Sequence, residues 1–142
     1  MRMRYGSTLA AALLIAAACN GSPGTAATGV PGDGTIVTSE KDFGIALEEA
    51  STPAGSTTFD ITNDGPSTHE FVVFKTDLAQ DALPVDGSTV TEGTLDLVDE
   101  AEDIAPGVGT SLTVDLEPGS YVVICNIEGH YTAGMHAALT VT

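Results

Sequence analysis

Between residues 35 and 142, the chain alternates short β-forming segments with clusters of turn-forming residues. The segments are rich in Val, Ile, Thr, Phe and Leu, and the turns include residues 63–66 (NDGP) and 118–119 (PG). Many short strands at this spacing favour a two-sheet sandwich or a Greek-key barrel. The expected strands are residues 35–39, 43–48, 56–62, 70–76, 94–98, 109–116, 120–125 and 135–141.

The stretch of residues 77–103 is longer and more acidic than a hairpin loop. Apolar residues such as Leu78 and Leu83 give it anchors, so we expect an ordered insertion that packs on the sandwich, with one or two helical turns at residues 77–82. A disordered acidic loop is the alternative. The predicted fold class is therefore all-β: a single Greek-key sandwich or barrel over residues 35–142, with a short helical and acidic insertion.

Residues 116–121 (LEPGSY) resemble the tyrosine corner of Greek-key sandwiches. In that arrangement a tyrosine just after a tight turn donates its hydroxyl back to nearby backbone. The resemblance puts Tyr121 on an interior strand that ends at Cys125.

The first 18 residues have the features of a targeting segment. Arg2 and Arg4 supply a positive start, residues 9–18 (LAAALLIAAA) form a short apolar core, and residues 16–18 form a small-residue cleavage site. Ten apolar residues are too few to cross a bilayer as a helix, which needs about 20. We therefore expect a signal peptide over residues 1–18 and an exported protein.

Cys19 follows this segment directly. Residues 14–19 (LIAAAC) resemble a bacterial lipobox, whose cysteine carries the lipid anchor of the mature lipoprotein. Cleavage by an ordinary secretory peptidase, which releases a soluble secreted or periplasmic protein, is the alternative. The Gly/Ser/Thr/Pro-rich residues after Cys19 form a flexible tether. Residues 19–34 are thus expected to hold the domain to the extracytoplasmic face of the cell membrane.

The charge of the chain is strongly negative. Beyond residue 18, only Lys41 and Lys75 oppose all 20 acidic residues, which gives a net charge of −18. Nucleic acid is excluded as a natural partner, because binding to phosphate needs lysine and arginine. The charge permits steering toward a basic partner protein, and simple solubility is the alternative reason for it.

Cys125 is the only cysteine in the body of the chain. If Cys19 carries lipid, Cys125 has no intramolecular disulfide partner. A lone thiol in an oxidising compartment is a liability, an intermolecular bridge or a metal ligand, and a buried inert cysteine is the plainest alternative. The neighbours of Cys125 favour a ligand, because residues 125–135 (CNIEGHYTAGM) carry a thiol, an imidazole and a thioether at five-residue intervals.

Four residues together form a candidate ligand set. His69 opens an apolar strand far upstream, and Cys125, His130 and Met135 follow on one loop. Two imidazoles, one thiolate and one weak thioether suit a mononuclear copper site for electron transfer.

Alternation along the last expected strand separates Met135 from its neighbour His136. Met135 shares a face with the apolar residues Ala137, Leu139 and Val141, so it points into the core. His136 lies on the opposite face and is expected to be a solvated surface histidine.

The chain resembles the cupredoxins, the small blue-copper proteins. The resemblance lies in the patterns Asn-x-Gly-x3-His at residues 63–69 and Tyr-x3-Cys-x4-His-x4-Met at residues 121–135, and it extends over nearly all of the predicted domain. The loop spacing is closer to the rusticyanin and auracyanin types than to plastocyanin. The resemblance implies one copper ion, with three strong equatorial ligands and one weak axial ligand: His69, Cys125 and His130, and then Met135.

Two residues depart from the usual cupredoxin pattern. Glu70 follows the first histidine, where many members have Asn, and Asn126 follows the cysteine, where Ser or Thr is common. The Glu70 carboxylate is expected to alter hydrogen bonding near the sulfur, and the Asn126 amide is expected to pin the loop. We expect these two differences to change the reduction potential of the site but not the identity of the metal.

A complete set of four protein ligands leaves no position for a substrate, which favours an electron carrier over an enzyme. Enzymes with several copper ions need more histidines than His69, His130 and His136. The leading hypothesis is an electron carrier at the outer face of the cytoplasmic membrane, which serves a cytochrome or a terminal oxidase and has no small-molecule substrate. A module that stores copper or delivers it to an oxidase is the second hypothesis, and a metal-free adhesion sandwich is the third.

By the same resemblance, electrons pass through the exposed edge of the loop histidine, His130. Apolar residues around it would form the docking surface, and the candidates are Pro66, Ile127, Tyr131 and Ala133. The alternative is that these side chains only pack against their neighbours and form no docking surface.

Overall fold

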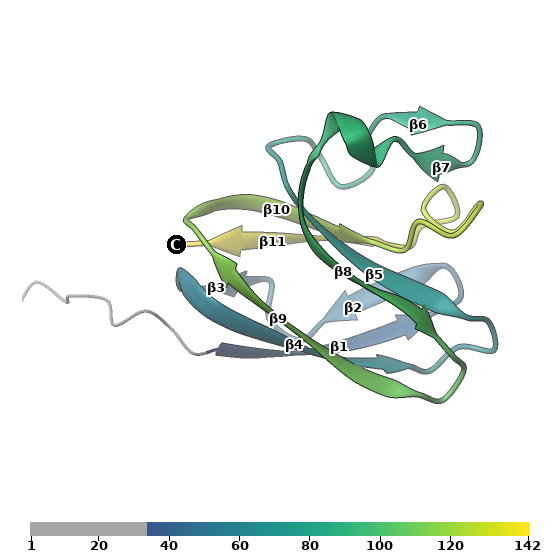
Figure 1. Ribbon diagram of the computed structural model, residues 1–142, viewed down its shortest axis with the longest axis horizontal. Coiled ribbons are helices and arrows are strands. Elements are labelled where there is room, and N and C mark those ends of the chain that lie inside the picture. Colours follow the sequence, from purple (N-terminus) through teal and green to yellow (C-terminus); the bar gives the residue numbers. More distant parts are fainter. Residues whose placement is uncertain (1–33) are drawn as a thin grey trace, which may run out of the picture.

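The computed structural model describes residues 34–142 (Figure 1). The expected signal peptide, Cys19 and the tether as far as residue 33 lie outside the described residues. Within residues 34–142, no helix is long and apolar enough to cross a membrane.

Two β-sheets pack face to face in a sandwich (Figure 1). The first sheet contains, in order, β2 (Gly44–Leu47), β1 (Gly34–Lys41), β4 (Gly55–Asn63) and β9 (Gly109–Leu116). The second contains, in order, β3 (Ser51–Thr52), β11 (His136–Val141), β10 (Gly119–Ile124), β5 (His69–Lys75) and β8 (Asp96–Ile104). Both sheets are mixed, because β1 runs parallel to β4 and β3 runs parallel to β11. The all-β sandwich predicted from the turn spacing is confirmed.

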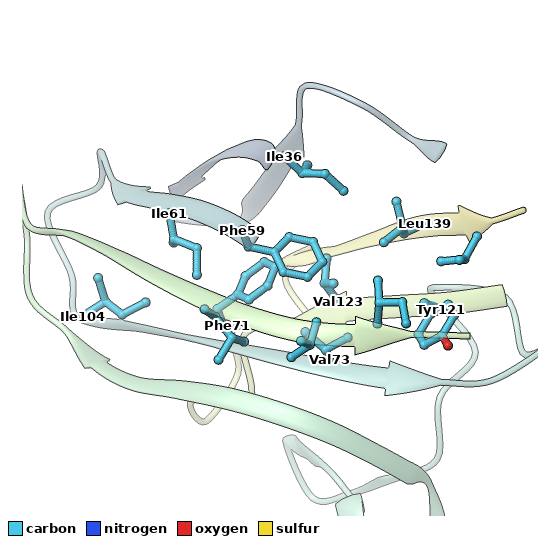
Figure 2. Packing of buried hydrophobic residues seen from close by; sticks show 13 residues of the cluster. Ile36, Phe59, Ile61, Phe71, Val73, Ile104, Tyr121, Val123 and Leu139 are labelled. Carbon is cyan, nitrogen blue, oxygen red and sulfur yellow. The ribbon is translucent and has the colours of Figure 1, made fainter. Parts of the chain in front are cut away.

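Apolar side chains from both sheets meet between the layers (Figure 2). Phe59 on β4 and Phe71 on β5 are fully buried, and their ring centroids lie 5.0 Å apart. The pair comes from opposite sheets, so it joins the two layers, and burial of each such side chain contributes about 1.5–3 kcal/mol. Other members of this cluster include Ile36, Ile61, Val73, Val123 and Leu139.

β5 and β10 are buried on both faces. Their outer face carries a second apolar cluster that includes Phe74 and Ile124, and Leu83 and Val90 of the insertion belong to the same cluster. The insertion therefore covers part of the outer face of the second sheet. It is ordered and packs on the sandwich, as predicted.

The helical turn of the insertion is not where the sequence predicts it. Residues 77–82 form no helix, and the Ala82 N–H closes a simple turn by donating to the Ala79 carbonyl at 2.9 Å. The hairpin of β6 (Val85–Asp86) and β7 (Thr89–Val90) comes next, and the short 3-10 helix η1 (Glu92–Thr94) follows it. The prediction of helix at residues 77–82 is wrong, because these residues are mostly exposed and so short a helix is not stable in water without packing.

The last part of the predicted insertion is a strand of the sandwich. Residues 96–103 belong to β8, which pairs with β5 at the edge of the second sheet. Acidic residues are poor strand formers, so the sequence indicated a loop beyond residue 98. An edge strand exposes most of its side chains, and its charges there remain hydrated and discourage pairing with another chain.

β10 carries Cys125 to one end of the sandwich. At the start of β10, the Tyr121 hydroxyl donates to the Glu117 carbonyl at 2.8 Å, as expected of a tyrosine corner. At its end, Ile124 pairs with Val72 of β5. Because β5 runs antiparallel to β10, the start of β5 at His69 lies at the same end of the sandwich as Cys125.

Candidate metal centre

A network of hydrogen bonds fixes the chain just before His69. The fully buried Asn63 donates from Nδ2 to the carbonyls of Ser67 at 2.8 Å and Ile104 at 2.7 Å, and its Oδ1 accepts the Gly65 N–H at 2.9 Å. The Asn63 side-chain amide thus stabilises the turn of residues 63–67 and connects this turn to the end of β8. His69 consequently enters β5 fully buried, in a fixed position.

The ligand loop of residues 125–135 is closed by its own backbone. The Cys125 N–H donates to the Met135 carbonyl, and the Met135 N–H donates to the His130 carbonyl, each at 3.1 Å. Gly134 has a φ of 117°, and a Cβ there would lie 3.1 Å from the Phe43 carbonyl oxygen. Glycine at this position therefore allows both the backbone conformation and the close approach of the turn between β1 and β2.

Three of the four predicted ligands converge on one point. Cys125 Sγ lies 3.4 Å from His130 Nδ1 and 3.9 Å from His69 Nδ1, and the two Nδ1 atoms are 3.3 Å apart. These three atoms lie within 4.8 Å of one another, and residues 34–142 contain no other such group of histidine, cysteine and carboxylate ligands. Met135 is fully buried and hydrogen-bonds through its backbone to Cys125 and His130. One sulfur and two imidazole nitrogens that face one another fit copper.

The comparison with known families decides what this site is. The family of copper-binding proteins described as the plastocyanin/azurin family matches residues 35–142. The chain belongs to this family, the cupredoxins. One copper ion is its cofactor.

Solved structures show the same fold. An auracyanin from Roseiflexus castenholzii is 20% identical over 80% of this cupredoxin and 99% of that chain, with a TM-score of 0.59. Auracyanin A, a blue copper protein from Chloroflexus aurantiacus, is 20% identical over 78% and 100%, with a TM-score of 0.56. Rusticyanin from Thiobacillus ferrooxidans is 19% identical over 79% of each chain, with a TM-score of 0.54. Among curated protein sequences, none matches.

Burial favours the neutral forms of Cys125 and His69 in this cupredoxin when no cation is present. Burial raises the pKa of the Cys125 thiol to about 11, although the Glu70 N–H donates to its sulfur at 3.5 Å and favours the thiolate. Burial, and then the charge of His130, lowers the pKa of His69. A metal ion that bound here would therefore have to displace the thiol proton, whereas the lowered pKa of His69 favours the neutral imidazole that binds a metal.

Of the two departures from the usual cupredoxin pattern, only Asn126 has a contact that its own side chain supplies, and the hydrogen bond expected to change with the Glu70 carboxylate comes from the backbone instead. Glu70 contacts the sulfur through its backbone N–H, so this hydrogen bond does not depend on its side chain. Asn126 accepts the Val90 N–H at 2.6 Å and donates from Nδ2 to the Val90 carbonyl at 3.0 Å and to a Glu92 carboxylate oxygen at 2.7 Å. The Asn126 amide thus holds the ligand loop against the insertion.

Tyr131 makes a second connection between the ligand loop and the insertion. Its hydroxyl accepts the Leu83 N–H at 2.9 Å and donates to the Gln80 carbonyl at 3.0 Å. Tyr131 is buried, so the prediction that it belongs to an exposed apolar rim is wrong.

His136 is half-buried, so the prediction that it is a solvated surface histidine is wrong as well. Its ring packs against the ring of Tyr131, with the two ring centroids 5.4 Å apart. The predicted insertion covers this face, but the sequence did not show on which side of the sandwich the insertion would pack.

We predict that Tyr131→Phe lowers the free energy of unfolding by about 1–3 kcal/mol, because the buried Leu83 N–H and the partly buried Gln80 carbonyl lose their partner. Tyr121→Phe is the matched control, since it removes one hydroxyl hydrogen bond at the opposite end of β10. Urea denaturation measures both losses. A Tyr131→Phe chain as stable as the unaltered one would show that these bonds do not hold the insertion.

The turn between β1 and β2 is the part of the site that sequence reasoning missed. Residues 43–48 are predicted as a strand, but Phe43 lies in the turn with a φ of 71°, and its side chain is 62% exposed. Its carbonyl approaches Gly134 of the ligand loop. In the same turn, Asp42 Oδ1 lies 3.2 Å from His69 Nε2. The only signal in the sequence was Asp42 and Gly44 on either side of Phe43, a pattern typical of an ordinary polar turn.

Proposed function

We propose that this cupredoxin carries single electrons and that His69, Cys125, His130 and Met135 hold its copper ion. The proposal is supported by the convergence of one sulfur and two imidazole nitrogens within 4.8 Å of one another. Cu(I) prefers soft sulfur ligands and Cu(II) accepts imidazole, so this mixed set binds both oxidation states.

The burial of the ligands suits rapid electron transfer. His69, Cys125 and Met135 are fully buried, and His130 alone is partly exposed. Closely packed side chains at these positions move little when the charge of the ion changes. The structural reorganisation that accompanies electron transfer is therefore small. Electrons accordingly enter and leave through the exposed edge of His130.

The proposed partner is a basic redox protein, either a cytochrome or a terminal oxidase. The net charge of −18 beyond residue 18 favours such a partner. Phe43 adds an exposed aromatic side chain beside the ligand loop, where Ile127 is half-buried and Pro66 and Ala133 are exposed. This apolar rim is the proposed docking surface.

The proposed location is the outer face of the cytoplasmic membrane, with lipid on Cys19. It is supported by the lipobox-like residues 14–19 and the tether that follows them. Mass spectrometry of the N-terminal peptide from membranes tests the lipid, and Cys19→Ser should move the protein into the soluble fraction. A membrane-bound Cys19→Ser protein would contradict the proposal.

Copper titration of the purified chain tests the proposed function. We expect one equivalent of Cu(II) to bind and to give an intense blue thiolate-to-copper band. Fast, reversible electron exchange with a cytochrome and slow loss of copper to a chelator support the carrier. Rapid loss of copper with no electron exchange would instead support copper delivery, and a chain that binds no copper would refute both roles.

Replacement of the axial ligand gives a second test. Met135→Leu should keep the blue colour and favour Cu(I) over Cu(II) by about tenfold, because an apolar axial side chain donates no electron density to Cu(II). For a one-electron couple, this is a rise of about 59 mV in reduction potential. Met135→Gln, which offers an oxygen donor, should shift the potential in the opposite direction. Cyclic voltammetry measures both, and equal potentials in all three chains would exclude Met135 as a ligand.

A further inference from the structure

The edge of the His69 ring that faces away from Cys125 meets a carboxylate. Asp42 Oδ1 lies 3.2 Å from His69 Nε2, within the range of an ion pair but outside the geometry of a hydrogen bond. Both atoms are buried, and neither has a hydrogen-bond partner among the described residues. Buried polar groups in native proteins almost always have a partner, so each of these atoms is the only available partner of the other.

The tautomer of His69 agrees with this pairing. Nδ1 is the nitrogen that faces Cys125 Sγ, at 3.9 Å, and His130 Nδ1, at 3.3 Å. A metal ion on Nδ1 leaves the ring proton on Nε2, where it can be donated only to Asp42. A carboxylate behind a ligand histidine fixes the orientation of the ring and raises the basicity of the ligand nitrogen.

The carboxylate of Asp42 is itself held in place. Its other oxygen, Oδ2, accepts the Ser67 hydroxyl at 2.9 Å. Gly65 packs against the same pair, and a Cβ at that position would lie 2.9 Å from both Asp42 Oδ1 and His69 Nε2. The β1–β2 turn and the turn before β5 therefore together form a closely fitting position for this carboxylate.

We infer that Asp42 is a positioning residue for the copper ligand His69 and that its carboxylate favours Cu(II) over Cu(I). The inference rests on the proposed function, in which copper binds His69 Nδ1. A negative charge on the far edge of the ring makes the imidazole a stronger donor, and the more highly charged Cu(II) gains more from it than Cu(I) does.

The test compares copper-loaded full chains that differ by one carboxylate. Asp42→Asn keeps the shape of the side chain and removes its charge, and we expect Cu(II) affinity to fall by about tenfold or more relative to Cu(I). The reduction potential then rises by about 59 mV for each factor of ten. Asp64→Asn is the matched control, because the exposed Asp64 lies in the turn before His69 but contacts Ser39.

The outcomes separate the inference from the proposed function. A rise in potential for Asp42→Asn that exceeds the rise for Asp64→Asn supports the inference, whereas equal shifts or no shift overturn it. If the unaltered chain gives no blue copper site, the proposed function fails as well. Should Asp42→Asn not fold, Ser67→Ala carries the test, since it loosens the same carboxylate. Ser67→Ala should raise the reduction potential by less than about 59 mV, the rise that corresponds to a tenfold change in affinity. An unchanged potential overturns the inference.

Discussion

Cys125→Ser should abolish the blue colour and weaken copper binding by more than about 100-fold. Loss of a residue that only supports a ligand already costs 10–100-fold in metal affinity, and the thiolate is a ligand itself in the proposed site. Serine keeps the size of the side chain but offers copper a hard oxygen in place of a soft sulfur. Absorption spectroscopy and competition with a copper chelator measure the two effects.

The chain supplies its own control for this substitution. Cys19→Ser removes the other cysteine, which is expected to carry lipid and not copper, so the colour should remain. Cys125 is fully buried, and an intermolecular disulfide would therefore require local unfolding. A blue copper complex that survives in Cys125→Ser would contradict the ligand set proposed for this cupredoxin.

The second large effect that we expect is on the free energy of unfolding, and it comes from Glu40. It lies on β1 and is fully buried, and neither of its carboxyl oxygens has a hydrogen-bond partner. Burial, and then the charge of Glu70, raises its pKa from 4.5 to about 8. An isolated carboxylate in a protein interior is strongly disfavoured, so the folded protein keeps Glu40 protonated at neutral pH.

The sign of the resulting pH dependence follows from the two pKa values. Between pH 4.5 and pH 8, the unfolded chain has released the Glu40 proton and the folded chain still holds it. Stability falls with rising pH wherever the folded state binds more protons. One pKa unit corresponds to about 1.4 kcal/mol, so this group alone lowers the free energy of unfolding by on the order of 5 kcal/mol across the window.

Glu40→Gln should remove this loss, because its amide carries no charge at any of these pH values. We expect the variant to gain stability relative to the unaltered chain from pH 4.5 to pH 8, with no further gain above pH 8. Urea denaturation of the copper-free chains at several pH values measures the difference, and the exposed Glu102→Gln serves as the control. A difference between the chains that stays constant with pH would show that Glu40 is ionised in the fold.

Local patterns account for the parts of the structure that the sequence predicted. Alternation of apolar and polar residues and the turn clusters depend on neighbours in the chain, and they indicated the sandwich and the tyrosine corner at Tyr121. The same alternation correctly assigned Met135 to the buried face and His136 to the other. It could not show that the ring of Tyr131 and the insertion lie on that other face, and so His136 is half-buried.

Contacts between distant segments account for the predictions that failed. Beyond residue 98, β8 looked like an acidic loop, because nothing in those residues reveals that they pair with β5. Residues 77–82 looked helical, but they are mostly exposed, so no packed apolar face stabilises a helix there. Glu40 sits in a strand whose other inward residues are Ile36 and Thr38, and only the packed structure shows that its carboxyl group is enclosed without a partner.

Local sequence was enough to predict the metal chemistry, because Cys125, His130 and Met135 lie within eleven residues and their donor atoms suit copper. Long-range packing sets which groups surround these side chains. The antiparallel pairing of β5 with β10 brings His69 to Cys125, and the turn between β1 and β2 brings Asp42 to the far edge of the His69 ring. These positions depend on how the two sheets pack against each other. The energy of that packing comes from the whole core, so no local pattern in the sequence reveals it.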